Sequence, residues 1–184
     1  PDVLKLEEVP DPTLEPGAVL VDVHYSGVNP TDITTRSGRG NYPSDFSFPA
    51  MLGREASGYV SAIGSEVHSI QVGDRVVVRN TAYSYAEQLI APESSIHVIP
   101  EGLETLAAAT VVVTYTTAWD AIVNKAKVKA GQSVLIQGAA GGVGIAGVQI
   151  AKRLGATVLG TAGTGEKLDW LKAQGLDHGI NYTA

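Results

Sequence analysis

One stretch, SVLIQGAAGGVGIAGVQIA at residues 133–151, constrains the fold of this chain more than any other. A short apolar run at 134–136 suits a strand that is buried on both faces. Glycines crowd positions 138–144, and the apolar residues beyond them recur at a spacing typical of one buried side of a helix. Strand, glycine turn and helix in this order are the context that a dinucleotide-binding fingerprint requires.

The residues of the turn meet the needs of a phosphate ligand. A helix N-terminus presents unpaired N–H groups and a partial positive charge, and side chains at the turn would block the phosphate. The candidate fingerprint consists of Ala139, Ala140, Gly141, Gly142, Val143 and Gly144. Alanine stands where the first glycine of the G-x-G-x-x-G pattern belongs. A glycine-rich turn that binds nothing is the alternative, whereas a P-loop is excluded because no Gly-Lys-Ser/Thr follows.

The chain divides into a β-rich half and an α/β half. Short apolar segments separated by glycine and proline turns fill residues 1–103 and suggest a small barrel or sandwich. Helical spacing follows at 103–125. Beyond it we expect strands at 134–137, 157–160 and 179–182, and helices at 142–154 and 166–174. This βαβαβ order is half of a doubly wound parallel sheet, so we predict that the chain is a fragment. The predicted domains are residues 1–103 and 104–184.

Composition and charge exclude several classes of function. The net charge of −6 disfavours a nucleic-acid partner, because no excess of Lys and Arg is available to neutralise phosphates. The absence of cysteine excludes disulfides and thiolate metal sites, and the four histidines show no metal-ligand spacing. The longest uncharged stretch, 105–119, is shorter than the roughly 20 apolar residues of a membrane span. With no signal peptide visible either, we expect a cytoplasmic protein without a membrane partner.

The end of the second expected strand bears on the choice of cofactor. A site for NAD usually places Asp or Glu about 20 residues past the fingerprint, where it holds the ribose hydroxyls. Thr161 occupies that region, and Lys167 follows it. A neutral rim with a nearby cation favours the 2′-phosphate of NADPH. The alternative is that Lys167 is only a solvated lysine in the first turn of a helix.

Several stretches in order resemble one family. They are SGVNPTDITTRSG (26–38), MLGREASGYVSAIGSEV (51–67), VGDRVVV (72–78), SYAEQLIAP (84–92), SVLIQGAAGGVGIAGVQIAKRLGATVLGTAGT (133–164) and INY (180–182). The chain resembles the zinc-free quinone oxidoreductase (zeta-crystallin-like) branch of the medium-chain dehydrogenase/reductase superfamily. The resemblance implies an α/β fold: a GroES-like β-rich catalytic domain, followed by a Rossmann doubly wound parallel sheet that is truncated in its C-terminal half.

The resemblance also implies which residues act in the first domain. Zinc-dependent members have cysteine at the position of Asn29 and histidine at the position of Arg54, so no metal is expected here. In zinc-free relatives the asparagine of Asn-Pro lies near the nicotinamide and the substrate, which implies this place for Asn29. A tyrosine in the following Gly-x-Tyr-Pro loop donates a proton or lines the pocket, and Tyr42 matches it. A further tyrosine common in quinone reductases is replaced by Thr34.

In the second domain the resemblance implies that Thr114 touches the carboxamide and that Lys167 and Tyr182 contact the phosphate. The cofactor-binding set is then Asn29, Thr114, Ala139, Gly141, Gly142, Val143, Gly144, Thr161, Lys167 and Tyr182, and the catalytic residues are Tyr42 and Asn29.

The expected function is NADPH:quinone oxidoreductase-like. A hydride would pass from the nicotinamide to a quinone or an α,β-unsaturated carbonyl. An enoyl-thioester reductase of the same superfamily, or a nucleotide-binding regulatory or structural protein without turnover, are the alternatives. A methyltransferase-type α/β domain is disfavoured, because its glycine turn usually follows an acidic residue and here Gln137 precedes it. Relatives are often dimers, which implies a homodimer for the complete protein.

Overall fold

The computed structural model describes residues 2–39, 47–79 and 83–184. The chain forms two compact units, Pro1–Val113 and Thr114–Ala184. The boundary predicted from the sequence, between residues 103 and 104, lies earlier in the chain and stays a prediction. None of the helices in the described part of the chain combines the length and the apolar character of a membrane-spanning segment.

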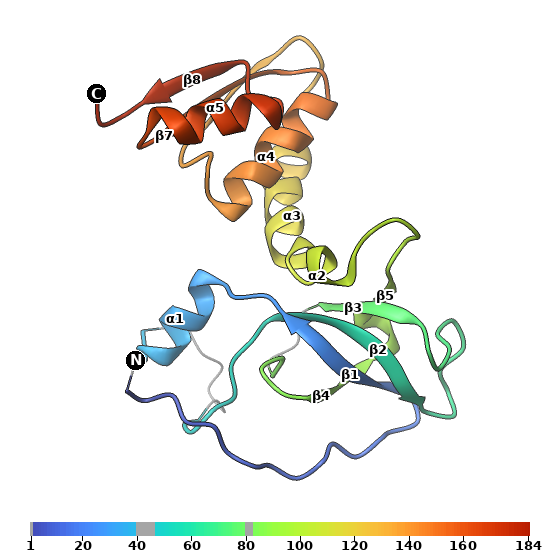
Figure 1. Ribbon diagram of the computed structural model, residues 1–184. Helices are drawn as coiled ribbons and strands as arrows, with labels where there is room; N and C mark the ends of the chain where they lie inside the picture. The colour runs from blue at the N-terminus through green and yellow to red at the C-terminus, as the bar shows by residue number, and fades with distance from the viewer. Residues whose placement is uncertain (1, 40–46, 80–82) are drawn as a thin grey trace. The chain divides into compact units, whose positions relative to one another are not determined.

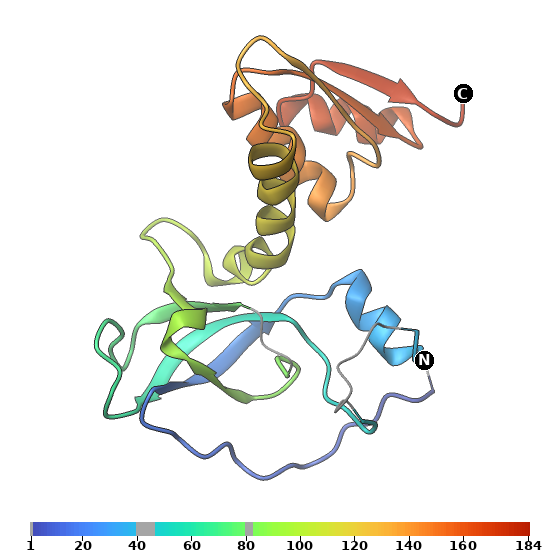
Figure 2. The same cartoon turned by 180° about the vertical axis from the view of Figure 1, so that it is seen from behind.

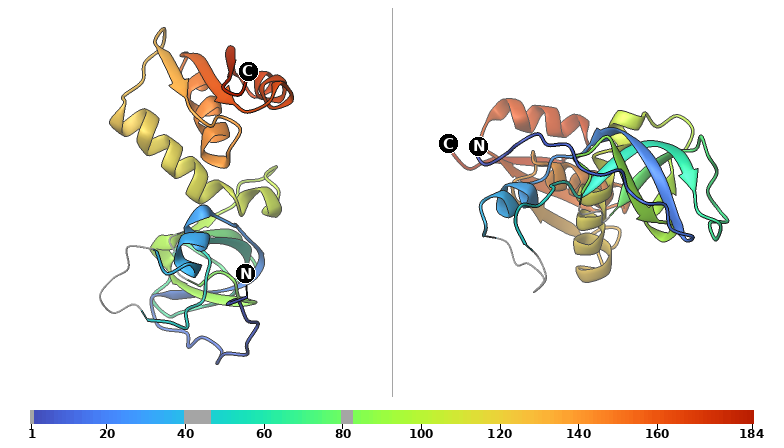
Figure 3. Two further views of the ribbon diagram at one scale, coloured as in Figure 1. Left: turned by 90° about the vertical axis from the view of Figure 1, so that its left-hand side faces the viewer. Right: turned by 90° about the horizontal axis from the view of Figure 1, so that it is seen from below.

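The first unit is built on one curled antiparallel sheet (Figures 1 and 3). Its strands are β1 (Ala18–Ser26), β2 (Glu55–Ile63), β3 (Arg75–Arg79), β4 (Gln88–Pro92) and β5 (Ile96–Val98). They lie in the order β4-β1-β2-β3-β5. Alternate residues such as Val19, Val21, Val76 and Val78 are fully buried on the inner face, because successive side chains of a strand point to opposite faces. The predicted β-rich half is therefore confirmed as a curled sheet.

Short helices complete the first unit and lead out of it. They are α1 (Pro30–Arg36), η1 (Glu93–Ser95), α2 (Thr105–Ala108), α3 (Val111–Trp119) and the π-helical η2 (Asp120–Lys125). Helix α2 packs against β1, β2 and β3, so residues beyond 103 still belong to the first unit. Helix α3 runs on directly into η2 (Figure 2). The helices predicted for residues 103–125 are thus present.

The second unit alternates strands and helices as predicted. The elements are β6 (Ser133–Ile136), α4 (Gly142–Arg153), β7 (Thr157–Ala162), α5 (Gly165–Ala173) and β8 (His178–Asn181). The strands are parallel in the order β6-β7-β8. Ile136 pairs with Gly160 in β7, and Ala162 of β7 pairs with Asn181 in β8. The carboxyl ends of all three strands therefore meet at one edge, which is where open α/β sheets bind ligands.

One expectation for the second unit is wrong. The sequence predicts that the apolar run of β6 is buried on both faces, but Leu135 is 54% exposed. Val134 and Ile136 point to the opposite face and pack into the core with α4. Gly147 of α4 leaves room there, since a Cβ at this position would lie 3.3 Å from the Ile136 Cδ1 atom. Helices cover the face with Val134 and Ile136, and nothing in the described part of the chain covers Leu135 to the same extent.

Asp177 ties the second unit together at the start of β8. Its Oδ2 accepts a hydrogen bond from the Val158 N–H at 2.8 Å, and its Oδ1 meets Lys152 Nζ at 2.5 Å. The hydrogen bond from Lys152, followed by that from Val158, lowers the pKa of Asp177. A lowered pKa adds stability above the unfolded-state value of about 3.9, and this stability is lost as the pH falls through the folded-state pKa.

We therefore expect Asp177→Asn to lower the thermal midpoint of the protein at pH 7 and to flatten its decline below about pH 4. Differential scanning fluorimetry from pH 7 to pH 3 measures both effects. Asp169→Asn is the matched control, because Asp169 pairs with Lys172 of its own helix at the exposed surface. If the thermal midpoints of the unchanged protein and of Asp177→Asn declined in parallel with falling pH, Asp177 would not be the source of this pH-dependent stability.

Candidate functional site

The glycine turn leads from the end of β6 into a helix without a side-chain cap. Gly141 is the N-cap of α4, with φ −84° and ψ 165°, and no side chain caps the helix there. The first N–H groups of a helix have no partner within the helix, and the macrodipole adds a partial positive charge at this end. Together they make a site for an anion such as phosphate.

The glycines of the turn serve different purposes. A Cβ at Gly144 would lie 2.4 Å from the Gly138 carbonyl oxygen and 2.7 Å from the Ala139 Cα atom, so Gly144 allows the helix to pack on the turn. A Cβ at Gly141 would meet only the Gly138 oxygen, at 3.4 Å, which is an ordinary contact. Gly141 is thus not required by packing. Its missing side chain keeps the approach to the helix N-terminus open.

Further predicted cofactor residues lie in this turn or beside it in the second unit. A Cβ at Gly142 would lie 3.0 Å from the Thr114 Cγ2 atom, which places Thr114 against the start of α4. Val143 is 42% exposed in the first turn of the helix. Ala139 is fully buried, backbone included, and its N–H donates to the Thr161 carbonyl oxygen, so this predicted cofactor residue does not lie at the surface of the turn. The structure thus brings most of the predicted fingerprint to one surface, while the methyl group of Ala139 serves the core.

Thr161 fastens β7 to the glycine turn. Its Oγ1 accepts a hydrogen bond from the Gly138 N–H at 3.1 Å, and its carbonyl oxygen accepts one from the Ala139 N–H at 2.9 Å. Gly138 adopts φ +61°, a left-handed conformation that favours glycine. A hydroxyl that accepts from the backbone can still donate its own hydrogen. Thr161 therefore presents a donor, and no carboxylate, at the end of β7.

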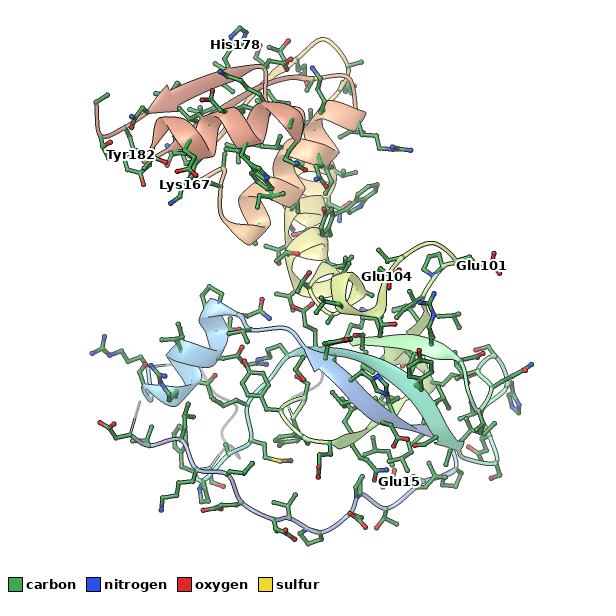
Figure 4. All side chains as sticks on the ribbon, in the orientation of Figure 1. Glu15, Glu101, Glu104, Lys167, His178 and Tyr182 are labelled. Atoms are coloured by element: carbon green, nitrogen blue, oxygen red, sulfur yellow. The ribbon has the colours of Figure 1, made fainter. Side chains whose placement is uncertain are left out.

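Lys167 and Tyr182 lie at the same edge of the sheet (Figure 4). Thr164 caps α5 by accepting a hydrogen bond from the Lys167 N–H at 3.3 Å, which places Lys167 in the first turn. Tyr182 follows β8 and is 66% exposed. Its hydroxyl would lie 3.0 Å from a Cβ at Gly163, so the ring covers the turn after β7. One ammonium group and one phenol thus stand beside the carboxyl end of β7.

In the first unit, Asn29 is held by two carboxylates. Its Nδ2 donates to Glu55 Oε1 at 2.9 Å, and its backbone N–H donates to Asp32 Oδ2 at 2.8 Å. Asn29 is 5% exposed, and Asp32 and Glu55 are also buried. Asn29 is the N-cap of α1, and Pro30 begins that helix. An Asn followed three residues later by an acidic residue resembles a capping box, so the sequence holds a local signal for Asp32, whereas it holds none for the contact with Glu55.

Tyr85 joins Asn29, Asp32 and Glu55 as a fourth residue of the cluster around Asn29, and the sequence analysis did not identify it. Its hydroxyl donates to Asp32 Oδ2 at 3.0 Å, and the Gly53 N–H donates to Asp32 Oδ1 at 3.3 Å. Burial, and then the hydrogen bond with Asp32, raise the pKa of Tyr85 to about 12. A phenol with this pKa stays protonated at neutral pH and is a poor acid. Tyr85 therefore acts as a donor to Asp32.

Two expectations, the role of Tyr42 and the absence of zinc, stay predictions. Tyr42, the predicted proton donor, lies outside the described residues. In the described ranges no three His, Cys, Asp or Glu side chains gather to hold a metal ion. Arg54, at the position where zinc-dependent relatives have histidine, is exposed.

Comparison with known proteins gives consistent matches. The alcohol dehydrogenase GroES-like domain family matches residues 15–101. Quinone oxidoreductase of Sus scrofa is 43% identical over 168 residues, which are 90% of this chain and 50% of that protein. Escherichia coli quinone oxidoreductase complexed with NADPH superposes with a TM-score of 0.88 at 32% identity, over 98% of this chain and 55% of that one. CurK enoyl reductase superposes with a TM-score of 0.92 at 28% identity, over 100% and 57%. The chain spans about half the length of the relatives that it matches.

Proposed function

The chain belongs to the quinone oxidoreductase branch of the medium-chain dehydrogenase/reductase superfamily, and we propose that the complete protein is an NADPH-dependent reductase that works without zinc. The observation that carries this proposal is the carboxyl edge of the sheet β6-β7-β8. There an uncapped helix N-terminus, a turn free of large side chains and Thr161 lie together. Such an edge suits the pyrophosphate of a dinucleotide.

The preference for NADPH follows from charge at the end of β7. Thr161 stands where a carboxylate would repel a phosphate, and Lys167 and Tyr182 are available to contact the 2′-phosphate of the adenosine ribose. A cation and a phenol hydroxyl are both donors to phosphate oxygens. The complex of the E. coli quinone oxidoreductase with NADPH supports a nicotinamide cofactor for this chain.

We expect Lys167→Ala to raise the KM for NADPH roughly ten-fold and to leave the KM for NADH within about two-fold, because only NADPH carries the charge that Lys167 would meet. Steady-state oxidation of both cofactors by the complete protein measures this. Lys172→Ala is the matched control on the same helix, since Lys172 pairs with Asp169 in the last turn. An equal loss for both cofactors would exclude Lys167 from recognition of the 2′-phosphate.

The residues of the first unit would serve the transfer itself. When bound, NADPH supplies a hydride for a quinone or for the β-carbon of an α,β-unsaturated carbonyl. Negative charge then develops on the carbonyl oxygen, and hydrogen-bond donors of the protein must stabilise it in the absence of a metal. We propose Tyr42 as the donor or acid at this oxygen and Asn29 as the residue that orients nicotinamide and substrate. Thr114 would contact the nicotinamide carboxamide, and the complete protein would be a homodimer.

The test is oxidation of NADPH and of NADH by the complete protein with a small quinone, a 2-enal and an enoyl thioester as acceptors. We expect turnover selective for NADPH on at least one acceptor. An enoyl-thioester reductase is the second candidate, favoured by the likeness to CurK enoyl reductase, and selective turnover of the thioester would establish it. Binding of NADPH without oxidation would instead support a regulatory or structural protein. Failure to bind either cofactor would refute the proposal.

A further inference from the structure

Glu55 is a buried carboxylate that the proposed reaction does not yet use. It is the first residue of β2 and is 1% exposed. Its Oε1 accepts a hydrogen bond from Asn29 Nδ2 at 2.9 Å, and its Oε2 accepts one from the Val113 N–H at 2.8 Å. Burial of a charged group is costly unless hydrogen bonds satisfy it, and here each carboxylate oxygen has a donor.

The Val113 N–H belongs to the first turn of α3, where a helix leaves its amide groups without partners. A carboxylate is favoured at this end of a helix by the macrodipole. Glu55 therefore caps α3 and holds Asn29 with the same group. Gly27 shows how closely this is packed, because a Cβ there would lie 2.4 Å from Glu55 Oε1 and 2.6 Å from the Ala109 carbonyl oxygen.

We propose that Glu55 is a positioning residue that fixes the side-chain amide of Asn29 in one orientation. An ionised carboxylate only accepts hydrogen bonds, whereas an amide has an accepting oxygen and a donating nitrogen. Nδ2 of Asn29 must therefore face Glu55, and Oδ1 is turned away from it. The backbone of Asn29 is held independently by Asp32. Oδ1 and the second Nδ2 hydrogen are then presented to the reaction in a set direction.

This inference rests on the proposed function only for the role of Asn29 at the reacting groups. In the observed orientation Asn29 offers its Oδ1 atom as an acceptor, because one Nδ2 hydrogen is already donated to Glu55. A reversed amide would present the nitrogen in place of Oδ1. The effect on turnover should then be larger than the effect on cofactor affinity, because preorganisation of a reacting geometry is lost while the phosphate contacts of the second unit remain.

The first test is Glu55→Gln in the complete protein. The introduced glutamine can accept only with its side-chain oxygen, so its nitrogen must face one of the two donors, and we expect Asn29 to reverse its amide. The kcat should fall at least roughly ten-fold while the KM for NADPH stays within about two-fold. The ¹H–¹⁵N signals of the Asn29 side-chain amide should move. Glu93→Gln is the matched control, because Glu93 also accepts from backbone N–H groups, those of His68 and Ser69, in the same unit.

The second test needs no turnover. In Asn29→Asp, two carboxylates would stand at the hydrogen-bond distance, so they must share a proton and one apparent pKa is raised. A raised pKa in the folded state gives stability that is lost as the pH rises through that value. As the pH rises from about 5 to about 8, the thermal midpoint of Asn29→Asp should therefore fall relative to that of the unchanged protein. Among the described residues, three further titratable groups lie close by: Asp32 on α1, which bonds to the Asn29 backbone, Tyr85, which bonds to Asp32, and Arg79 on β3, which is opposite Glu55.

Adding Glu55→Gln to Asn29→Asp should abolish this pH dependence, since the introduced glutamine can donate to the introduced carboxylate and accept from the Val113 N–H. A thermal midpoint of Asn29→Asp that depends on pH as in the unchanged protein would overturn the proposal, as would Glu55→Gln with unchanged kcat and amide signals. The midpoint and the amide signals distinguish this failure from failure of the proposed function, which would show as absence of NADPH oxidation by the unchanged protein.

Discussion

Gly144→Ala is expected to destabilise the second unit by about 3 kcal/mol or more and thereby to remove NADPH binding. The added Cβ would lie 2.4 Å from the Gly138 carbonyl oxygen and 2.7 Å from the Ala139 carbonyl oxygen. These are backbone atoms of the turn, so they cannot turn away as the end of a flexible side chain could. The helix must shift from the turn, and the turn is also held by its hydrogen bonds to Thr161.

Gly141→Ala separates the packing role of the turn from its binding role. Its Cβ would make only an ordinary contact, at 3.4 Å from the Gly138 carbonyl oxygen, and the backbone of Gly141 does not need glycine. We expect a loss of stability of about 1 kcal/mol or less, typical of alanine at an N-cap. The methyl group would stand at the helix N-terminus where a phosphate must approach, so NADPH affinity should fall at least roughly ten-fold.

Urea unfolding of the complete protein and fluorescence titration with NADPH measure both variants. Gly165→Ala is the control, since nothing lies within 4 Å of a Cβ at this first residue of α5. Two results would contradict the interpretation. One is a Gly144→Ala protein as stable as the unchanged one, and the other is a Gly141→Ala protein that binds NADPH with unchanged affinity.

The second unit could be predicted closely from the sequence because its signals are local. Each strand and helix has its own periodicity, and the glycines mark the turn between β6 and α4. The boundaries of the elements then follow within a few residues. What the local signals could not show is burial that depends on other elements. Ala139 reads as part of a ligand-binding turn but is fully buried, and Leu135 reads as core but is exposed.

The cluster around Asn29 could be predicted only in part. A family resemblance points to Asn29 itself, and Asp32 follows it within the same helical turn. Glu55 and Tyr85 reach the cluster from β2 and from the segment before β4, through contacts across the sheet that no spacing in the sequence encodes. Glu55 becomes a neighbour of Asn29 because β1 pairs with β2, which sets Ser26 opposite Ala56. A pattern of charges along a sequence therefore cannot identify which carboxylates accept hydrogen bonds from Asn29.

Tyr42→Phe is expected to lower kcat roughly 100-fold and to leave the affinity for NADPH within about two-fold, because a general acid contributes about 100-fold or more to a proton transfer. Tyr85→Phe is the matched variant, because the Tyr85 hydroxyl bonds to Asp32, the same carboxylate that accepts from the Asn29 backbone. Its hydroxyl already donates to Asp32, and its pKa of about 12 makes it a poor acid. We expect Tyr85→Phe to keep kcat within about three-fold while lowering stability by about 1 kcal/mol.

The pH dependence of kcat distinguishes the two phenols further. A phenol with a pKa of about 12 does not ionise between about pH 6 and pH 10, so any decline of kcat in this range cannot belong to Tyr85. If Tyr42 is the acid, Tyr42→Phe should remove an alkaline decline that the unchanged protein and Tyr85→Phe share. The opposite pattern, with slow turnover in Tyr85→Phe and unchanged turnover in Tyr42→Phe, would transfer the role of donor to Tyr85, whose hydroxyl is hydrogen-bonded to Asp32.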